Sequence, residues 1–363
     1  MPDHQLSDCS LLRIAMIAPP WYEVPPTGYG GIEVLIGHLI DELAERRHEV
    51  LLVGAGRHRT KARRFVPVVD RPIADQLGEP VPEVLHAARV AAALHDVEID
   101  LVHDHTLAGP LLAEARDVPT VVTAHGNVDG DFGGYYRALG KGVQLVAISD
   151  RQRRQSPDLN WVATVHNAID VDTFPFRSDK DDYVMWLGRY CPEKAPHLAI
   201  DAARAAGVPI VLAGKCAEAA ERAYFEREIE PRLGPGVRHL GEADARGKRE
   251  LLSGARALLF PVQWEEPFGI VMIEAMACGT PVIALCRGSV PEIVVDGRTG
   301  LVVDDPAQLP RAIHDASGID PSACREHVRT KFDVPVMAAA YERVYRAVVG
   351  ATLPAIDGVS AGA

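Results

Sequence analysis

The chain has 363 residues, of which 47% are hydrophobic and 24% charged, and its formal net charge is -12 at pH 7. This is about twice a common domain length, so two packed domains of ordinary globular composition are expected. The negative charge argues against a nucleic-acid partner, because phosphate backbones are held by broad basic surfaces. A small anionic ligand would have to be met by a few local cations.

The ends of the chain and its cysteines indicate the compartment. The apolar stretch 11–18 is too short to span a bilayer and follows an acidic leader, so it predicts a first strand and no signal peptide. Residues 1–10 and 351–363 are expected to be flexible tails. Six cysteines lack the spacing of a disulfide framework or a zinc site, which favours a cytoplasmic protein. They are Cys9, Cys191, Cys216, Cys278, Cys286 and Cys324.

The basic cluster at 57–64 predicts a solvated loop surface, with peripheral membrane contact as the alternative. The cluster contains Arg57, Arg59, Lys61, Arg63 and Arg64. The sequence leaves open whether the protein is a monomer or a dimer.

Short apolar runs alternate with amphipathic helical stretches, a pattern typical of βα units around parallel sheets. The first expected helix has apolar residues at helical spacing from Ile32 to Leu43. Strands are expected at 12–18, 50–54, 99–103, 120–124 and 144–149, and then at 183–188, 209–214, 257–262 and 281–286.

This α/β pattern predicts two Rossmann-like doubly wound domains that face each other across a cleft. The first would span 11–172 and the second 173–332, with a polar, proline-broken linker at 170–182. A last helix at 333–350 would cross back to the first domain. Ligands are expected at the carboxyl ends of both sheets.

The segment 265–279 follows an expected strand and begins an expected helix. Because proline is favoured at the first helical position, Pro267 would place Glu266 at the cap and leave the following amides for a phosphate. Eight residues of helix rise about 12 Å, so Glu266 and Glu274 could bracket a diphosphate between a sugar and a ribose. Taken alone, two glutamates at this spacing would by default be a helix cap and an exposed helix residue. The candidate phosphate-binding residues are Phe268, Gly269, Ile270 and Val271.

The run 266–284 resembles the E-x7-E segment of glycosyltransferase family 4, of the actinobacterial type, and the likeness extends over 11–349. The resemblance implies the GT-B fold, a nucleotide-diphosphate sugar as donor and retention of the anomeric configuration. It also implies that the first domain presents the acceptor and the second holds the donor. In the family the first glutamate contacts the transferred hexose and the second contacts the ribose hydroxyls. These roles fall to Glu266 and Glu274.

The block 188–194 ends the expected first strand of the second domain and resembles the family's G-R-x(n)-E-K element. In the family, its arginine and lysine hold the donor diphosphate, and these are Arg189 and Lys194 here. They are the local cations that an acidic protein needs for such a ligand. Ala195 stands where the family often has glycine, a departure that could shift the loop.

Glycines between the first strand and the first helix would let backbone amides approach a ligand. The stretch lacks the G-x-G-x-x-G spacing, and the second strand lacks a following acid, so a dehydrogenase is disfavoured. It resembles the family's glycine loop, in which Gly30 and Gly31 would lie over the donor phosphates. Tyr22 or Glu23 would then lie near the acceptor.

Three histidines follow strand ends, at His103, His105 and His125. Successive residues of a strand alternate between its two faces, and no cysteine or carboxylate framework accompanies these histidines, so no metal site is predicted. The family has a sugar-binding histidine at the position of His125. Asp104 and His105 are expected to line the acceptor side.

Two further segments resemble family elements without a catalytic role. Around 165–170, Ala168 replaces the glycine of a family turn, so either the turn is adjusted or the glycine is not needed. In the loop 287–292, Glu292 is expected to be structural.

The resemblance thus implies a retaining glycosyltransferase that needs no cofactor or metal and moves a hexose to the hydroxyl of an unknown acceptor. UDP is slightly favoured over GDP in the donor. Arg189, Lys194 and the helix start at Phe268 would stabilise the leaving diphosphate, and no side chain is assigned as nucleophile. The alternatives are a sugar-nucleotide epimerase or glycan phosphorylase of the same fold, and a non-catalytic sugar-nucleotide-binding protein.

Overall fold

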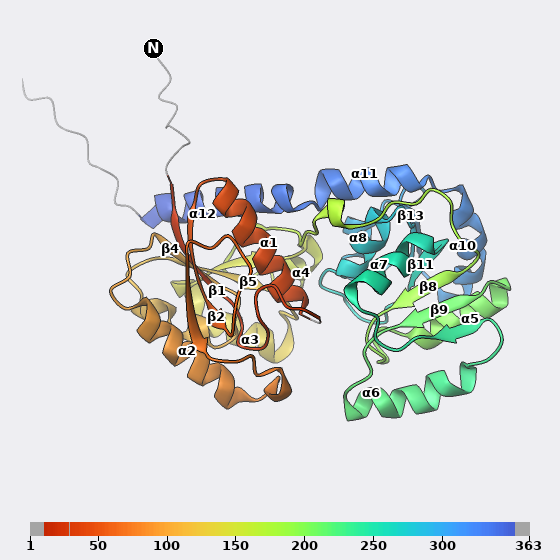
Figure 1. Cartoon of the computed structure of the whole chain (residues 1–363), viewed down its shortest axis with the longest axis horizontal. Helices are drawn as coiled ribbons and strands as arrows, with labels where there is room; N and C mark the ends of the chain where they lie inside the picture. The colour runs from red at the N-terminus through yellow and green to blue at the C-terminus, as the bar shows by residue number, and fades with distance from the viewer. Residues whose placement is uncertain (1–10, 29, 353–363) are drawn as a thin grey trace, which may run out of the picture. The chain divides into compact units, whose positions relative to one another are not determined.

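A computed structural model of the chain describes residues 11–28 and 30–352 (Figure 1). The described residues form two compact units. The first contains the described parts of 1–147 and 338–363 together with 156–165, and the second contains 148–155 and 166–337. The tails expected at 1–10 and beyond 352 lie outside the described residues.

In the first unit the described strands form one parallel sheet of seven, in the order β3-β2-β1-β4-β5-β6-β7. The strands are β1 (Arg13–Ile17), β2 (Glu49–Ala55), β3 (Arg64–Val69), β4 (Leu101–Asp104), β5 (Thr120–Ala124), β6 (Gln144–Ala147) and β7 (Trp161–Thr164). The helices are α1 (Gly31–Glu45), α2 (Pro80–Leu94) and α3 (Gly130–Ala138), with 3-10 turns at η1 (Ala74–Gln76), η2 (Gly109–Ala115) and η3 (Gly140–Gly142).

The described strands of the second unit form a parallel sheet of six, in the order β10-β9-β8-β11-β12-β13. They are β8 (Val184–Leu187), β9 (Ile210–Ala213), β10 (Val237–His239), β11 (Ala257–Phe260), β12 (Val282–Leu285) and β13 (Gly300–Val303). The helices are α4 (Asp150–Gln155), α5 (Pro196–Ala206), α6 (Ala219–Tyr224), α7 (Ala245–Gly254), α8 (Ile270–Ala277), α9 (Val290–Ile293), α10 (Leu309–Asp315) and α11 (Pro321–Lys331). The last helix of the chain, α12 (Val334–Thr352), runs from the second unit into the first.

Both sheets have the strand order of a doubly wound fold, because the chain starts at a central strand, moves to one edge and then returns to build the other side. In the second unit, neighbouring strand residues face opposite layers of helix. Met185 and Leu258 pack in the core formed with α8 and α11, whereas Val184 and Leu259 pack with α5 and α10. The α/β fold with two doubly wound domains is confirmed.

All nine expected strands are present, and their ends agree with the expected ones to within two residues. Four strands were not expected, namely β3, β7, β10 and β13, and each lies at the edge of its sheet. The first helix buries Leu35, Ile36, Leu39, Ile40 and Leu43, which confirms its predicted apolar stripe.

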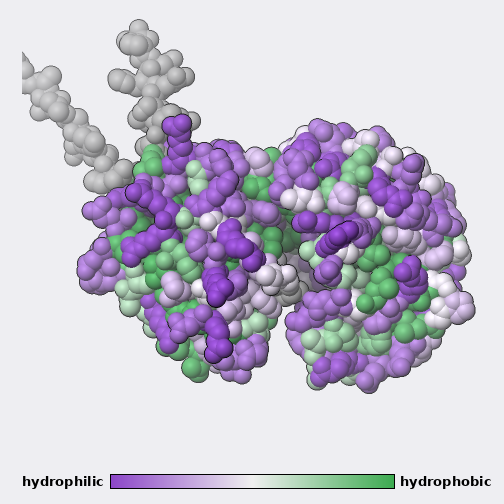
Figure 2. Space-filling view, in the orientation of Figure 1, coloured by the Kyte–Doolittle hydropathy of each residue, from purple (hydrophilic) through white to green (hydrophobic). Residues whose placement is uncertain are grey.

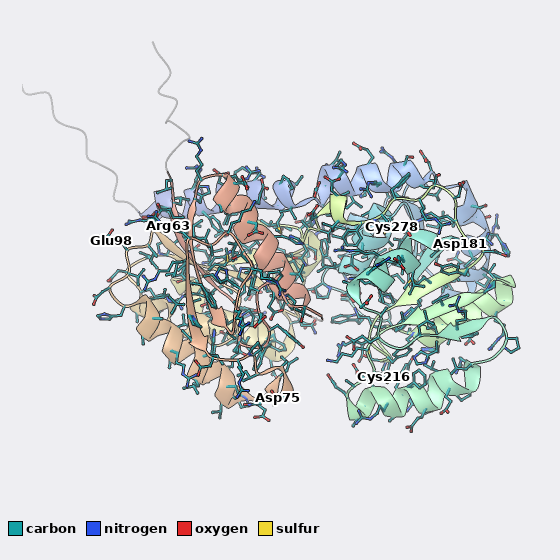
Figure 3. The ribbon with its side chains drawn as sticks, viewed as in Figure 1. Arg63, Asp75, Glu98, Asp181, Cys216 and Cys278 are labelled. Atoms are coloured by element: carbon teal, nitrogen blue, oxygen red, sulfur yellow. The ribbon has the colours of Figure 1, made fainter. Side chains whose placement is uncertain are left out.

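The basic cluster at 57–64 is part of the surface of the first unit, and two of its members form ion pairs. Lys61 forms an ion pair with Glu45, and Arg63, labelled in Figure 3, forms one with Glu49. The face of the protein shown in Figure 2 mixes hydrophilic and apolar side chains. Within the described residues, no helix combines the length and the apolar character that crossing a membrane requires.

The cysteines of the described residues are all free thiols. Figure 3 labels two of them, Cys216 and Cys278, in different parts of the second unit. Cys278 is buried, and its burial raises the pKa of its thiol to about 12. Its thiolate is therefore not populated near neutral pH.

Helix α12 is joined to the sheet of the first unit by a buried hydrogen-bonded network. His103 Nδ1 lies 2.7 Å from the hydroxyl of Tyr345, and its Nε2 lies 2.8 Å from Oγ1 of Thr123. The same Oγ1 lies 2.8 Å from the hydroxyl of Tyr341. Burial lowers the pKa of His103 well below its usual range, so the ring is neutral. The network thus connects α12 with β4 and β5 through neutral polar groups.

Tyr345→Phe should lower the free energy of unfolding by about 1–3 kcal/mol, because it leaves a buried nitrogen of His103 without a partner. Tyr341→Phe is the matched control, since Thr123 keeps its bond to His103 in that variant. Its loss should be smaller. Urea unfolding of the two variants measures the difference, and a loss for Tyr341→Phe equal to or greater than that for Tyr345→Phe would contradict the assignment.

Candidate active site

The E-x7-E segment does not form one helix from Pro267, and that prediction is wrong. Helix α8 begins at Ile270, and Gly269 before it has the left-handed conformation with φ 76°. A β carbon at 269 would lie 2.8 Å from Cζ of Phe260, so both conformation and space favour glycine there. Glu266 is therefore no helix cap. The expected helical rise between Glu266 and Glu274 does not apply, because only the last part of the segment is helical.

Glu266 is nearly buried, with 7% of its surface exposed, and it is held through one carboxylate oxygen. Its Oε2 forms an ion pair with Nζ of Lys194 and accepts a hydrogen bond of 2.8 Å from Nε1 of Trp264. Nζ of Lys194 also lies 5.3 Å from the centre of the Trp264 ring. A buried carboxylate needs such partners, because its transfer from water is costly. The structure thus brings the two predicted residues Glu266 and Lys194 together.

Glu274 is also nearly buried, at 8% exposed, and it has its own lysine. Its Oε1 lies 2.5 Å from Nζ of Lys248, a residue of α7. Lys248 was not found from the sequence. A single lysine on the polar face of a helix carries no signal, and the pair joins positions far apart in the chain.

Arg189 follows β8 and is held by acidic residues at the start of α6. Its Nη1 lies 3.4 Å from Oε1 of Glu221 and 3.9 Å from Oε1 of Glu218. About half of the Arg189 side chain is exposed, so it can contact a ligand.

Ala195 adopts the left-handed conformation, with φ 47°. That backbone costs alanine roughly 1–2 kcal/mol and glycine almost nothing.

The loop after β12 braces the backbone of the E-x7-E segment. The amide of Ser289 donates to the carbonyl oxygen of Glu266 at 3.0 Å, and its hydroxyl donates to the carbonyl oxygen of Phe268 at 2.8 Å. The amide of Gly288 donates to Oε2 of Glu265 at 3.0 Å. A β carbon at 288 would lie 2.3 Å from the carbonyl oxygen of Glu266. Gly288 and Ser289 therefore fix where Glu266 stands, a role that the sequence did not reveal.

Glu292 has the structural role that was expected. Its carboxylate accepts hydrogen bonds from the amides of Asp150 and Arg151, at 2.8 and 2.5 Å, which open α4. Among the described non-glycine residues, positive φ angles occur at Arg47, Asp96 and Ala195. Ala168 thus has an ordinary backbone, and its turn does not need a glycine.

The histidines of the first unit are arranged differently from the prediction. His103 and His105 lie on the same side, because side chains two residues apart in an extended chain share a face. Their ring centres are 4.0 Å apart. His105 Nδ1 lies 2.8 Å from Nε2 of His125. His125 is partly exposed and remains the candidate for a ligand contact.

Asp104 does not line an acceptor surface, and that expectation is wrong. The residue is completely buried, it forms an ion pair with Arg116 at 3.2 Å, and it accepts hydrogen bonds from the amide and hydroxyl of Thr106. Its carboxylate is used to hold the turn after β4. His105 is also buried, at 5% exposed.

The glycine loop leads into α1 as expected. Gly30 is the N-cap with φ 140°, and Gly31 is the first helical residue. A β carbon at Gly30 would lie 2.9 Å from Cγ of Pro26. Glu33 in the first turn is buried, and burial raises its pKa to about 7.

No grouping of three or more potential metal ligands occurs among the described residues.

Two family models match the chain in succession. The model "Glycosyltransferase Family 4" matches residues 29–186, and "Glycosyl transferases group 1" matches residues 170–318. The alpha-maltose-1-phosphate synthase of Mycolicibacterium smegmatis is 30% identical over 339 residues, which cover 80% of this chain and 84% of that protein.

Solved structures with the same fold include that of AviGT4, a glycosyltransferase involved in avilamycin A biosynthesis. It has a TM-score of 0.72 and 25% identity, and the match covers 93% of this chain and 98% of that one. Anabaena HepE in complex with UDP-glucose has a TM-score of 0.71 at 18% identity, covering 93% and 100%. The two doubly wound units and these matches define a glycosyltransferase with the GT-B fold. The chain belongs to glycosyltransferase family 4.

Gly288→Ala should disturb Glu266 far more than an ordinary glycine substitution would. The new β carbon must displace the backbone of Glu266, and a misplacement of about 1 Å can lower a rate about a hundredfold. Gly297→Ala is the matched control. Both glycines have a positive φ, 53° at Gly288 and 72° at Gly297, but a β carbon at Gly297 would have nothing within 4 Å.

The left-handed alanine should cost both variants roughly 1–2 kcal/mol of stability. The clash with the backbone of Glu266 should cost Gly288→Ala further stability and most of its transferase activity. Urea unfolding and initial rates measure the two effects. Equal behaviour of the two variants would contradict the bracing role of Gly288.

Proposed function

We propose that the protein is a retaining hexosyltransferase that takes its sugar from a nucleotide-diphosphate donor and transfers it to an acceptor hydroxyl. The observation that carries the proposal is the pair of nearly buried glutamates of the second unit, each neutralised by a lysine. Glu266 lies just before α8 and Glu274 lies within it, and the amides of Ile270 and Val271 at the start of this helix have no intrahelical acceptor. A phosphate is the ligand that such a helix start favours.

The contacts of the two glutamates suggest how they share one donor. Lys194 and Trp264 both contact Oε2 of Glu266, so Oε1 is the oxygen that can accept a hydrogen bond from a hexose hydroxyl. Lys248 contacts Oε1 of Glu274, so Oε2 can accept from a ribose hydroxyl. Each lysine holds one oxygen of its carboxylate in place, and the other oxygen would bind the ligand.

Arg189 and Lys194 supply the positive charge for the donor diphosphate. Arg189, whose side chain is about half exposed, would exchange its contacts with the exposed Glu218 and the buried Glu221 for the phosphate oxygens, which suit the fork of a guanidinium. Together with the helix start they would stabilise the charge that develops on the leaving diphosphate. We therefore propose that no metal ion is needed for this step.

The acceptor hydroxyl would attack on the face from which the diphosphate leaves, so the anomeric configuration is retained. A phosphate oxygen would take the proton of the acceptor hydroxyl, and no side chain needs to act as nucleophile. His125 of the first unit would bind a hydroxyl of the transferred hexose. UDP-glucose is the donor to test first, because HepE, which shares the fold, is described in complex with it.

Changing each glutamate to glutamine should separate the two roles. Glu274→Gln should weaken the binding of both UDP-glucose and UDP, because both ligands carry the ribose. Glu266→Gln should bind UDP almost normally and lower turnover, since its proposed partner is the sugar that UDP lacks. Calorimetric titration with UDP and initial rates with UDP-glucose measure these effects.

The melting temperature of each variant is the control, because each substitution also removes an ion pair with a buried carboxylate. Equal losses of UDP affinity in the two variants, at unchanged melting temperature, would contradict the division of roles between Glu266 and Glu274.

A further inference from the structure

A short chain of polar contacts runs through the first unit behind His125. His105 Nε2 lies 3.1 Å from the sulfur of Met16, and His105 Nδ1 lies 2.8 Å from Nε2 of His125. Met16 is completely buried and His105 is 5% exposed, whereas His125 is partly exposed. The chain of contacts thus leads from the core to a histidine that is partly exposed.

The topology of the sheet creates this arrangement. Strand β4 pairs with both β1 and β5, and Met16 on β1 stands opposite His103 on β4. His105 and His125 each follow the last residues of their strands, β4 and β5. The amide of His105 still donates to the carbonyl oxygen of Ile17 at 3.1 Å, which holds the residue against β1. The three side chains therefore come from adjacent strands at the carboxyl edge of the sheet.

The sulfur of Met16 determines which nitrogen of His105 carries the proton. A thioether sulfur has no hydrogen to donate and acts only as a weak acceptor. At a separation of 3.1 Å, an unprotonated Nε2 would point its lone pair at the lone pairs of the sulfur. Nε2 of His105 therefore carries the hydrogen and donates it to Met16.

Burial keeps both rings of the His105–His125 pair neutral. It lowers the pKa of His105 well below its usual range and lowers the pKa of His125 to about 4. A neutral imidazole carries a hydrogen on one nitrogen only. Since His105 carries it on Nε2, its Nδ1 is an acceptor, and the hydrogen in the bond between the two rings belongs to Nε2 of His125. Nδ1 of His125 is then left with a lone pair.

We propose that Met16 and His105 are positioning residues that fix the tautomer of His125, so that its Nδ1 accepts a hydrogen bond from a hydroxyl of the transferred hexose. The assignment of the hexose rests on the proposed function, whereas the tautomer rests on the geometry of the first unit alone. In this state His125 has no proton to give at Nδ1. It selects and orients a hydroxyl donor and takes no part as a general acid.

The tautomer can be measured directly in the full-length protein without a ligand. The protein is labelled with 15N-histidine, and long-range 1H–15N correlation spectra show which ring nitrogen of each neutral histidine carries the hydrogen. The spectrum of His125→Gln identifies the signals of His125 by their loss. We expect His125 and His105 both to carry the hydrogen on Nε2. A hydrogen on Nδ1 of His125 would overturn the proposal, whatever donor the enzyme uses.

Three variants test whether Met16 and His105 set this state. Met16→Leu should give a mixture of His125 tautomers, whereas Met185→Leu, at a buried methionine of the second unit, should leave the spectrum unchanged. His105→Phe removes the acceptor for His125, and His105→Asn restores one through its amide oxygen. An unchanged His125 tautomer in both Met16→Leu and His105→Phe would overturn the positioning role.

Kinetics with UDP-glucose give the second readout. Losing the hydrogen bond between the rings should lower kcat/KM about two- to tenfold in His105→Phe, and His105→Asn should recover most of it. A failure of recovery with a wild-type-like tautomer would count against the positioning role. If the wild-type protein does not use UDP-glucose but shows the expected tautomer, the choice of donor is wrong and the tautomer assignment stands.

Discussion

Two carboxylates that are almost removed from water, Glu266 and Glu274, are the constraint on which the rest of the second unit depends. Burying an ionised carboxylate is costly unless a cation and hydrogen bonds accompany it. Lys194 comes from the loop after β8 and pairs with Glu266 before α8, and Lys248 comes from α7 and pairs with Glu274 within α8, so two distant segments are tied to the E-x7-E segment. Breaking one pair would leave a charge uncompensated, whereas a polyhydroxylated ligand can use the second oxygen of each carboxylate without breaking either.

In both units the strand order determines where the candidate site residues lie. In each sheet the first strand of the unit lies in the centre, and the chain reverses direction beside it, at β1 and β4 or at β8 and β11. Loops diverge at this point and leave space for ligands at the carboxyl ends. Arg189 and Glu266 follow β8 and β11, and His105 follows β4. One rule of topology thus accounts for residues that the sequence separates widely.

Much of the fold could be predicted from the sequence because central parallel strands are continuous apolar runs. The edge strands were missed for the same reason: β3 contains Pro67 and is only partly buried, and β10 has two exposed residues out of three. An edge strand has neighbours on one side only, so it needs fewer apolar residues. Family membership and the fold followed from the motif around Glu266.

The finer geometry of the candidate site could not be read from the sequence. Pro267 has the preference for a helix start, but the left-handed Gly269 and its tight contact with Phe260 delay α8 to Ile270. At this position tertiary packing outweighs the local preference of proline for the first turn of a helix. Lys248 and Met16 gave no sequence signal at all, because their roles depend on which segment lies opposite them. His105 was recognised as a candidate, yet its place behind His125 follows from the end of β4.

Titration of the protein with UDP in the presence of EDTA tests most directly whether the second unit holds a nucleoside diphosphate with its own side chains. The account predicts that UDP binds without a divalent cation. It also predicts that Arg189→Ala weakens this binding at least about tenfold, since a charge-assisted hydrogen bond contributes about 1.5–3 kcal/mol. Arg246→Ala, at an exposed arginine paired with Glu250, should bind UDP like the wild type. A requirement for a divalent cation, or an unchanged affinity in Arg189→Ala, would contradict the account.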